Sequence, residues 1–112
     1  AELCYGYFGS STGAAAALLA AAERPGDTAA VVSRGGRVDM AEERLGDVAA
    51  PTLFVVGGAD DVVLELNRDA YDELDCEKSL EVVEDAGHLF EGPGELEAVA
   101  TLAADWFETH LS

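Results

Sequence analysis

The chain has very few basic residues. It contains one lysine, Lys78, and five arginines against 23 aspartates and glutamates, which gives a net charge of −17. Nucleic acids are bound through clustered lysines and arginines, and anionic membrane surfaces attract the same residues, so we expect neither as a partner. The acidic residues are spread along the chain. This pattern is typical of a cytoplasmic protein adapted to high salt, which screens the self-repulsion, and the alternative is an ordinary acidic protein.

Long apolar runs and cysteines are also scarce. The longest apolar run, residues 14–22, is mostly alanine and too short to cross a bilayer. The two cysteines, Cys4 in a strand-like run and Cys76 in a polar turn, form no metal-ligand spacing, so we expect a reducing compartment, no metal and no cofactor. The chain does not begin with Met and starts almost inside the strand-like run, which suggests a fragment of a longer protein.

Strand-like and helical segments alternate along the chain. This alternation predicts an α/β fold, with a parallel sheet of about four strands, right-handed crossovers and helices on both faces. We see no internal repeat or linker, so residues 1–112 are expected to form one domain or part of one. The predicted strands are 3–8, 28–33, 52–56 and 79–84, and the predicted helical segments are 13–23, 39–45 (short, or a turn), 63–74 and 94–111.

The segment between the first predicted strand and helix has the pattern G-x-S-x-G, from Gly9 to Gly13. In a nucleophile elbow the serine takes a strained backbone, and glycines two residues to either side avoid a collision. On this interpretation Ser11 is the nucleophile, and the N–H of Thr12 contributes to an oxyanion hole at the helix start. The alternative is that Ser10 or Ser11 is an ordinary helix N-cap.

Two further candidates follow the later strands. Asp60 comes after the third predicted strand and His88 after the fourth, at the sheet edge where ligands bind in parallel sheets. Each has an ordinary alternative as a loop residue, while Asp61 is expected to cap the next helix or to be solvated. The order Ser, Asp, His matches a hydrolase triad, in which His88 takes the proton of Ser11 and Asp60 orients the imidazole.

Three segments carry a resemblance to a known family. GYFGSSTG (6–13), PTLFVVGGADDVV (51–63) and DAGHLFEGPG (85–94) resemble the carboxyl-terminal half of an α/β-hydrolase, and are most similar to the dienelactone-hydrolase-like branch. The segment SRGGRVDMA (33–41) is more weakly similar to hydrolase-like domains fused behind a phosphoribosyltransferase-like domain. The resemblance implies a partial hydrolase domain that runs from the elbow strand to the last helix.

The resemblance also implies the roles of single residues. It makes Ser11, Asp60 and His88 the triad and Thr12 one oxyanion donor. Dienelactone hydrolases proper use a cysteine where Ser11 stands, so lactone specificity does not carry over. The family's early strands and the loop that gives a second oxyanion donor precede the elbow strand, where this chain has no residues. We expect the missing amino-terminal half, or self-association, to cover the exposed sheet edge.

The leading hypothesis is a serine hydrolase that acts on an ester, thioester or other acyl bond of a small molecule. We expect residues 1–112 alone to have weak hydrolase activity or none. A second hypothesis is a non-catalytic hydrolase-like module that mediates assembly or regulates a fused enzyme. A third, metal-dependent hydrolysis through Asp60, Asp61 and His88, is disfavoured because adjacent acids rarely face one ion. Arg34 and Arg37 are candidates to bind a substrate carboxylate or phosphate, or to form surface ion pairs.

Overall fold

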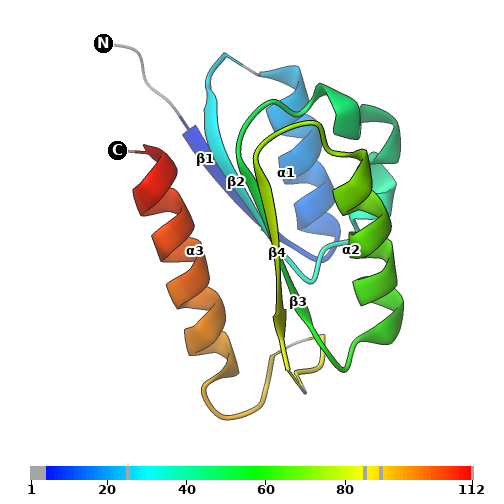
Figure 1. Ribbon diagram of the computed structural model, residues 1–112, viewed down its shortest axis with the longest axis vertical. Coiled ribbons are helices and arrows are strands. Elements are labelled where there is room, and N and C mark those ends of the chain that lie inside the picture. The colour runs from blue at the N-terminus through cyan, green and yellow to red at the C-terminus, as the bar shows by residue number, and fades with distance from the viewer. Residues whose placement is uncertain (1–4, 25, 85, 89, 112) are drawn as a thin grey trace.

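The computed structural model describes residues 5–24, 26–84, 86–88 and 90–111 (Figure 1). These residues form a sheet of four strands with helices, which confirms the predicted α/β fold. The elements in chain order are β1 (Tyr5–Ser10), α1 (Thr12–Glu23), β2 (Thr28–Arg34), the 3-10 helix η1 (Val38–Asp47), β3 (Thr52–Gly57), α2 (Asp61–Glu73), β4 (Lys78–Val83) and α3 (Glu95–Leu111).

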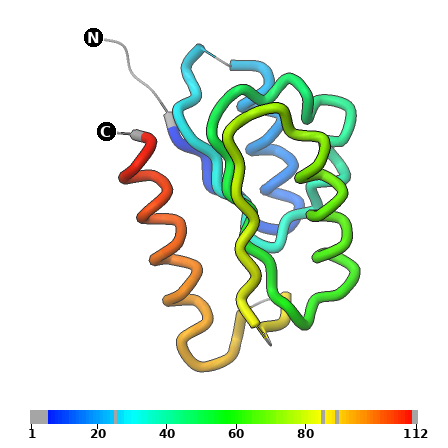
Figure 2. Tube along the Cα trace, viewed as in Figure 1, coloured from blue at the N-terminus to red at the C-terminus, as the bar shows by residue number. Residues whose placement is uncertain are grey.

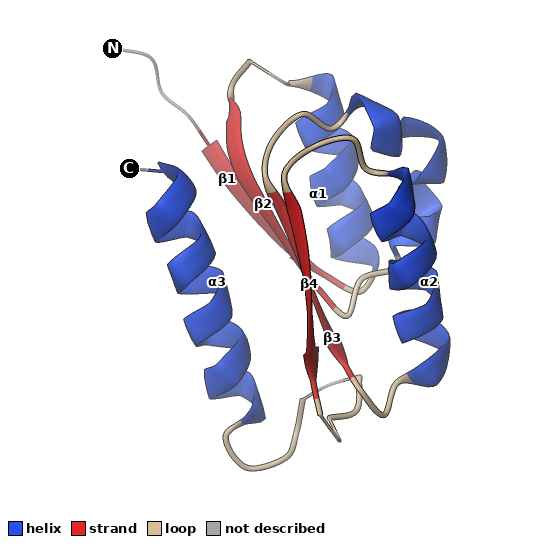
Figure 3. Ribbon diagram, viewed as in Figure 1, coloured by secondary structure: helices blue, strands red, loops and turns tan. Residues whose placement is uncertain are grey.

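The strands lie in chain order, β1-β2-β3-β4, and every neighbouring pair is parallel. Helices α1, η1 and α2 cover one face of the sheet and α3 covers the other (Figure 3). The end of α3 lies near the first residues of β1 (Figure 2). Because parallel strands end at the same edge, the loops that follow β1, β2, β3 and β4 gather at one end of the molecule.

The first strand differs most from its prediction. Residues 3 and 4, and with them Cys4, lie outside the described part of the chain. At its other end β1 continues through Gly9 and Ser10, which pair with Ser33 and Arg34 of β2. Two of the five G-x-S-x-G residues therefore belong to the strand, and the turn itself is sharper than the sequence indicated.

The core consists of two apolar layers, one on each side of the sheet. The layer under α1, η1 and α2 contains Leu18, Leu45 and Phe54, and the layer under α3 contains Val32 and Phe90. Helix α1 approaches the sheet on small side chains, because five of its six buried residues are alanine. This close approach holds the start of α1 firmly behind the end of β1.

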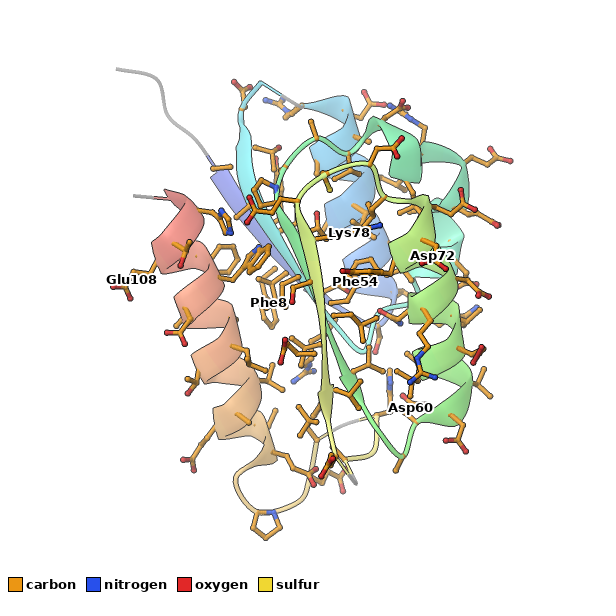
Figure 4. The ribbon with its side chains drawn as sticks, viewed as in Figure 1. Phe8, Phe54, Asp60, Asp72, Lys78 and Glu108 are labelled. Carbon is orange, nitrogen blue, oxygen red and sulfur yellow. The ribbon has the colours of Figure 1, made fainter. Side chains whose placement is uncertain are left out.

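The two edge strands of the sheet, β4 and β1, both leave side chains exposed to solvent. We predicted helices on both faces of the sheet, yet no residue of β4 is fully buried, so the helices leave this strand partly exposed. At the opposite edge Tyr7 packs against the α1 layer, and Phe8 lies on the α3 side with half of its surface, 50%, exposed (Figure 4).

Among the described residues, no helix combines the length and apolar character needed to cross a membrane.

The contrast between two phenylalanines gives a stability prediction. Phe54 is completely buried, whereas Phe8 is half exposed. We expect Phe54→Ala to lower the free energy of unfolding by about 3–5 kcal/mol, because the side chain leaves a cavity, and Phe8→Ala to lower it much less. Urea denaturation followed by circular dichroism measures both. Equal losses for the two variants would contradict this account of the core.

Candidate active site

Ser11 is the single residue between β1 and α1, and its backbone is strained. Its φ is 51° and its ψ is −124°, a region that residues with side chains rarely adopt. Three backbone hydrogen bonds hold it there: the Ser11 N–H donates to the carbonyl of Arg34 at 3.3 Å, and the Ser11 carbonyl accepts from the N–H groups of Arg37 at 2.9 Å and Ala14 at 3.2 Å. The loop after β2 therefore fixes the conformation of the turn.

The two glycines of the motif are not equivalent. A Cβ on Gly9 would overlap the backbone of Gly13 and Ala14, so a glycine is required at Gly9. A Cβ on Gly13 would have no described atom within 4 Å outside its own helix and chain neighbours. The prediction that both glycines prevent a collision is therefore correct for Gly9 and wrong for Gly13.

Ser11 is the N-cap residue of α1 by position, but its side chain makes no cap hydrogen bond, so it is not an ordinary side-chain cap. Its Oγ lies 2.6 Å from Nε2 of His88, and Nδ1 of the same ring lies 2.8 Å from Oδ2 of Asp60. Because an ionised carboxylate only accepts hydrogen bonds, the proton belongs on Nδ1, and Nε2 accepts from the serine hydroxyl. Three side chains predicted from separate strand ends thus form one hydrogen-bonded chain.

Asp60 and His88 come from loops that are joined through their backbones. The Ala59 N–H donates to the carbonyl of Ala86 at 2.9 Å, directly beside the aspartate. A Cβ on Gly57 would overlap the Ala86 carbonyl, so the loops approach each other closely only because Gly57 is a glycine. This contact sets the separation of the carboxylate from the imidazole.

Exposure to solvent differs between the side chains of Asp60 and His88. The Asp60 side chain is 17% exposed and that of His88 is 36% exposed, so the carboxylate is shielded while solvent reaches the imidazole. Thr12 is the first residue of α1, and its N–H is one of the amides that have no acceptor within the helix. Chemically, the arrangement offers a hydroxyl, a base to take its proton, and an adjacent backbone donor.

The helix that follows Asp60 starts earlier than predicted. Asp60 is the N-cap residue of α2 through its backbone, since its carbonyl accepts from the N–H of Leu64 at 2.8 Å. Asp61 is therefore the first residue of the helix rather than its cap, and it is exposed as the solvated alternative predicted.

Among the described residues, no group of three His, Cys, Asp or Glu side chains gathers closely enough to hold a metal ion.

The two candidate arginines lie in different settings. Arg37 makes two hydrogen bonds of 3.1 Å to the carboxylate of Asp39. This pairing raises the pKa of the Arg37 guanidinium and lowers the pKa of Asp39. Arg34 ends β2 beside the turn, and its guanidinium carbon lies 5.8 Å from the ring centre of Phe90. Substrate binding by either arginine stays a prediction.

Gly35, directly after β2, was not among the candidate site residues, but it faces the His88 ring. Its φ is 54°, and its N–H donates to the carbonyl of Val55 at 2.7 Å. A Cβ added to Gly35 would lie 3.3 Å from Nδ1 and 3.4 Å from Cε1 of His88. Gly35 therefore faces the imidazole with little room for a side chain between them. The glycine pair after β2 was the available signal, although it did not indicate which ring would rest there.

Comparisons with known proteins agree with this fold. The structure superimposes on a dienelactone hydrolase from Anabaena variabilis with a TM-score of 0.92 and 55% identity, covering 94% of this chain and 49% of that one. The dienelactone-hydrolase-like α/β-hydrolase resemblance is confirmed. The fold also matches an esterase domain from Rhodothermus marinus (TM-score 0.84, 19% identity, 96% of this chain and 61% of that one) and a monoacylglycerol lipase from Paleococcus ferrophilus (TM-score 0.80, 17% identity, 95% and 69%).

The sequence comparison gives a second relationship. The chain is 59% identical over 111 residues to a Mycobacterium tuberculosis protein named "Putative phosphoribosyl transferase", covering 99% of this chain. The chain spans 25% of the length of that relative, and about half of the dienelactone hydrolase. This match agrees with the weaker resemblance predicted from residues 33–41. No family model matches the chain.

The close approach of Gly35 to the imidazole generates a prediction. In Gly35→Ala the added methyl group favours a negative φ and presses on the His88 ring, so we expect the ring to move away from Ser11. Nitrogen NMR of the imidazole measures the change. Gly46→Ala is the matched control, because its Cβ would meet open space. A histidine signal that is the same in both variants would contradict this role of Gly35.

Proposed function

We propose that this chain carries the nucleophile, the base and the acid of a serine hydrolase that acts on ester, thioester or other acyl bonds of a small molecule. The observation that supports this most is the chain of hydrogen bonds from Ser11 through His88 to Asp60, 2.6 and 2.8 Å long, on a strained strand-to-helix turn. The hydrolase-like fold of the structural neighbours supports it further.

In the proposed mechanism His88 Nε2 removes the proton from the Ser11 hydroxyl as the oxygen attacks the acyl carbon. The charge that develops on the imidazole is stabilised by Asp60, and the oxyanion accepts a hydrogen bond from the N–H of Thr12. The protonated His88 then gives its proton to the leaving group, which leaves an acyl group on Ser11. A water molecule activated by His88 hydrolyses that ester and restores the serine.

A complete site needs parts that these residues do not supply. An oxyanion hole uses at least two donors, and the turn provides one, at Thr12. The edge strand β1 leaves Phe8 half exposed. We infer that further segments of a longer polypeptide, or a second copy of the chain, extend the sheet at β1 and provide the second donor. The chain's 49% coverage of the dienelactone hydrolase supports the first possibility.

A second candidate function is a non-catalytic hydrolase-like module that assembles or regulates a fused enzyme. One observation favours it: the chain matches 25% of a protein named for phosphoribosyl transfer, and that name says nothing of hydrolysis. The two candidates differ in whether Ser11 reacts as a nucleophile, and a covalent probe decides between them.

Reactivity of Ser11 tests the proposed function. In the intact gene product that contains this chain, we expect a serine-directed phosphonate to label Ser11, and Ser11→Ala to abolish the labelling. Ser10→Ala is the matched control, because Ser10 lies in β1 and pairs with Arg34 rather than with His88. Mass spectrometry of the labelled peptide identifies the serine.

Two results would count against the proposal, the first against hydrolysis and the second against Ser11 as the nucleophile. An unlabelled intact protein, with His88 correctly placed, would favour the non-catalytic module. Labelling that survives Ser11→Ala and is lost in Ser10→Ala would identify Ser10 as the nucleophile and contradict the assignment of Ser11.

The need for further segments gives a quantitative prediction. Losing one oxyanion donor typically lowers turnover on the order of a hundredfold or more. We therefore expect residues 1–112 alone to react with the phosphonate at least roughly a hundredfold more slowly than the intact gene product. Labelling rates measured side by side give the ratio, and equal rates would show that the second donor is not needed from outside.

A further inference from the structure

Asn67 is a completely buried amide in an otherwise apolar position. It lies in the middle of α2, on the stripe that also buries Val63 and Ala70, and its exposure is 0%. Burying an amide is unfavourable unless it is hydrogen-bonded. An apolar residue would fill this helix face at lower cost, so the bonds of Asn67 indicate what the amide contributes.

Both N–H groups of Asn67 are used. Nδ2 donates to the carbonyl of Val63 at 2.8 Å, within its own helix, and to the carbonyl of Gly36 at 3.0 Å. The second bond crosses from α2 to the loop between β2 and η1. Gly36 is itself tightly enclosed, because a Cβ there would overlap the side chains of Ser33 and Ala14. The crosslink therefore reaches a segment of backbone that has little freedom to move.

The loop that Asn67 holds contacts two members of the site. On one side of Gly36, Gly35 faces the His88 ring so closely that an added Cβ would lie 3.3 Å from Nδ1. On the other side, the Arg37 N–H donates to the carbonyl of Ser11 at 2.9 Å. Asn67 is the only described side chain with a hydrogen bond to the carbonyl of Gly36.

The helix that carries Asn67 begins immediately after Asp60. The bond from Asn67 to Gly36 thus joins the helix behind the carboxylate to the loop that faces the imidazole and fixes the serine turn. One buried amide connects the backbones that hold all three side chains.

We propose that Asn67 is a positioning residue of this site: its hydrogen bond to Gly36 sets the distance and angle between the Ser11 hydroxyl and the His88 imidazole. The inference rests on the proposed function, since positioning matters for catalysis only if Ser11 is the nucleophile. Misplacement of a reacting group by about 1 Å can cost roughly a hundredfold in rate.

The test uses Asn67→Ser in the intact gene product. A serine at this position can still donate to the carbonyl of Val63 four residues earlier, but is too short to reach Gly36, so the variant removes the crosslink selectively. Thr52→Val is the matched control: it removes a buried hydrogen bond of 2.9 Å, to the Ala50 carbonyl, at the opposite end of β3. Thermal unfolding shows how far each variant is destabilised.

Two readouts are compared. We expect Asn67→Ser to slow phosphonate labelling of Ser11 by roughly ten- to a hundredfold and to shift the imidazole NMR signal of His88. We expect Thr52→Val to change neither, although it also loses a buried bond. The His88 NMR signal does not depend on the reaction of Ser11 with the phosphonate. A wild-type protein that is not labelled would therefore refute the proposed function, while the change of the His88 signal in Asn67→Ser would still test the positioning role.

Specific outcomes overturn the inference. It fails if Asn67→Ser keeps the wild-type labelling rate and the wild-type His88 signal, or if Thr52→Val moves both as much. Should Asn67→Ser not fold, Asn67→Gln decides, because it keeps both donors but places them one methylene further out. A shifted His88 signal in that variant supports positioning, and an unshifted one refutes it.

Discussion

The site depends on one constraint, the parallel alignment of strands in chain order. Ser11 and His88 are 77 residues apart, yet their side chains meet because β1 and β4 end at the same edge of one sheet. Two strands lie between them, and the side chains span this separation with a hydrogen bond of 2.6 Å. The loop after β2 lies beside this bond: a Cβ on Gly35 would press on the His88 ring, and the Arg37 N–H donates to the carbonyl of Ser11.

The strain at Ser11 follows from the same arrangement. A residue held at φ 51° costs on the order of 1–3 kcal/mol, and such strain persists only where the surroundings impose it. Here the pairing of Ser10 with β2 extends the strand to the last residue before the turn, and the alanine face of α1 brings the helix in directly behind it. The serine side chain is thereby turned away from capping α1 and toward the histidine.

The sequence predicted what depends on local pattern. Apolar runs located the strands, and their parallel order placed Ser11, Asp60 and His88 at one edge before any contact was known. Features that depend on distant neighbours were not predictable in this way. The extension of β1 through Ser10 comes from pairing with β2, the exposure of β4 comes from its place at an edge, and the role of Gly35 comes from a ring 53 residues away in the chain.

The two edges of the sheet differ in charge, although each also exposes an apolar side chain, Phe8 in β1 and Val82 in β4. Edge strands in soluble proteins are protected by charged side chains, and β4 carries two, Lys78 and Glu81. The described residues of β1 carry no charge, and its Phe8 is half exposed on the face where α3 leaves it uncovered. An apolar, uncharged edge beside a nucleophile turn suits a strand that continues into more sheet. We therefore infer that β4 is a true outer edge, whereas β1 lies in the interior of a wider sheet, where the same extension would bring the second oxyanion donor to Ser11.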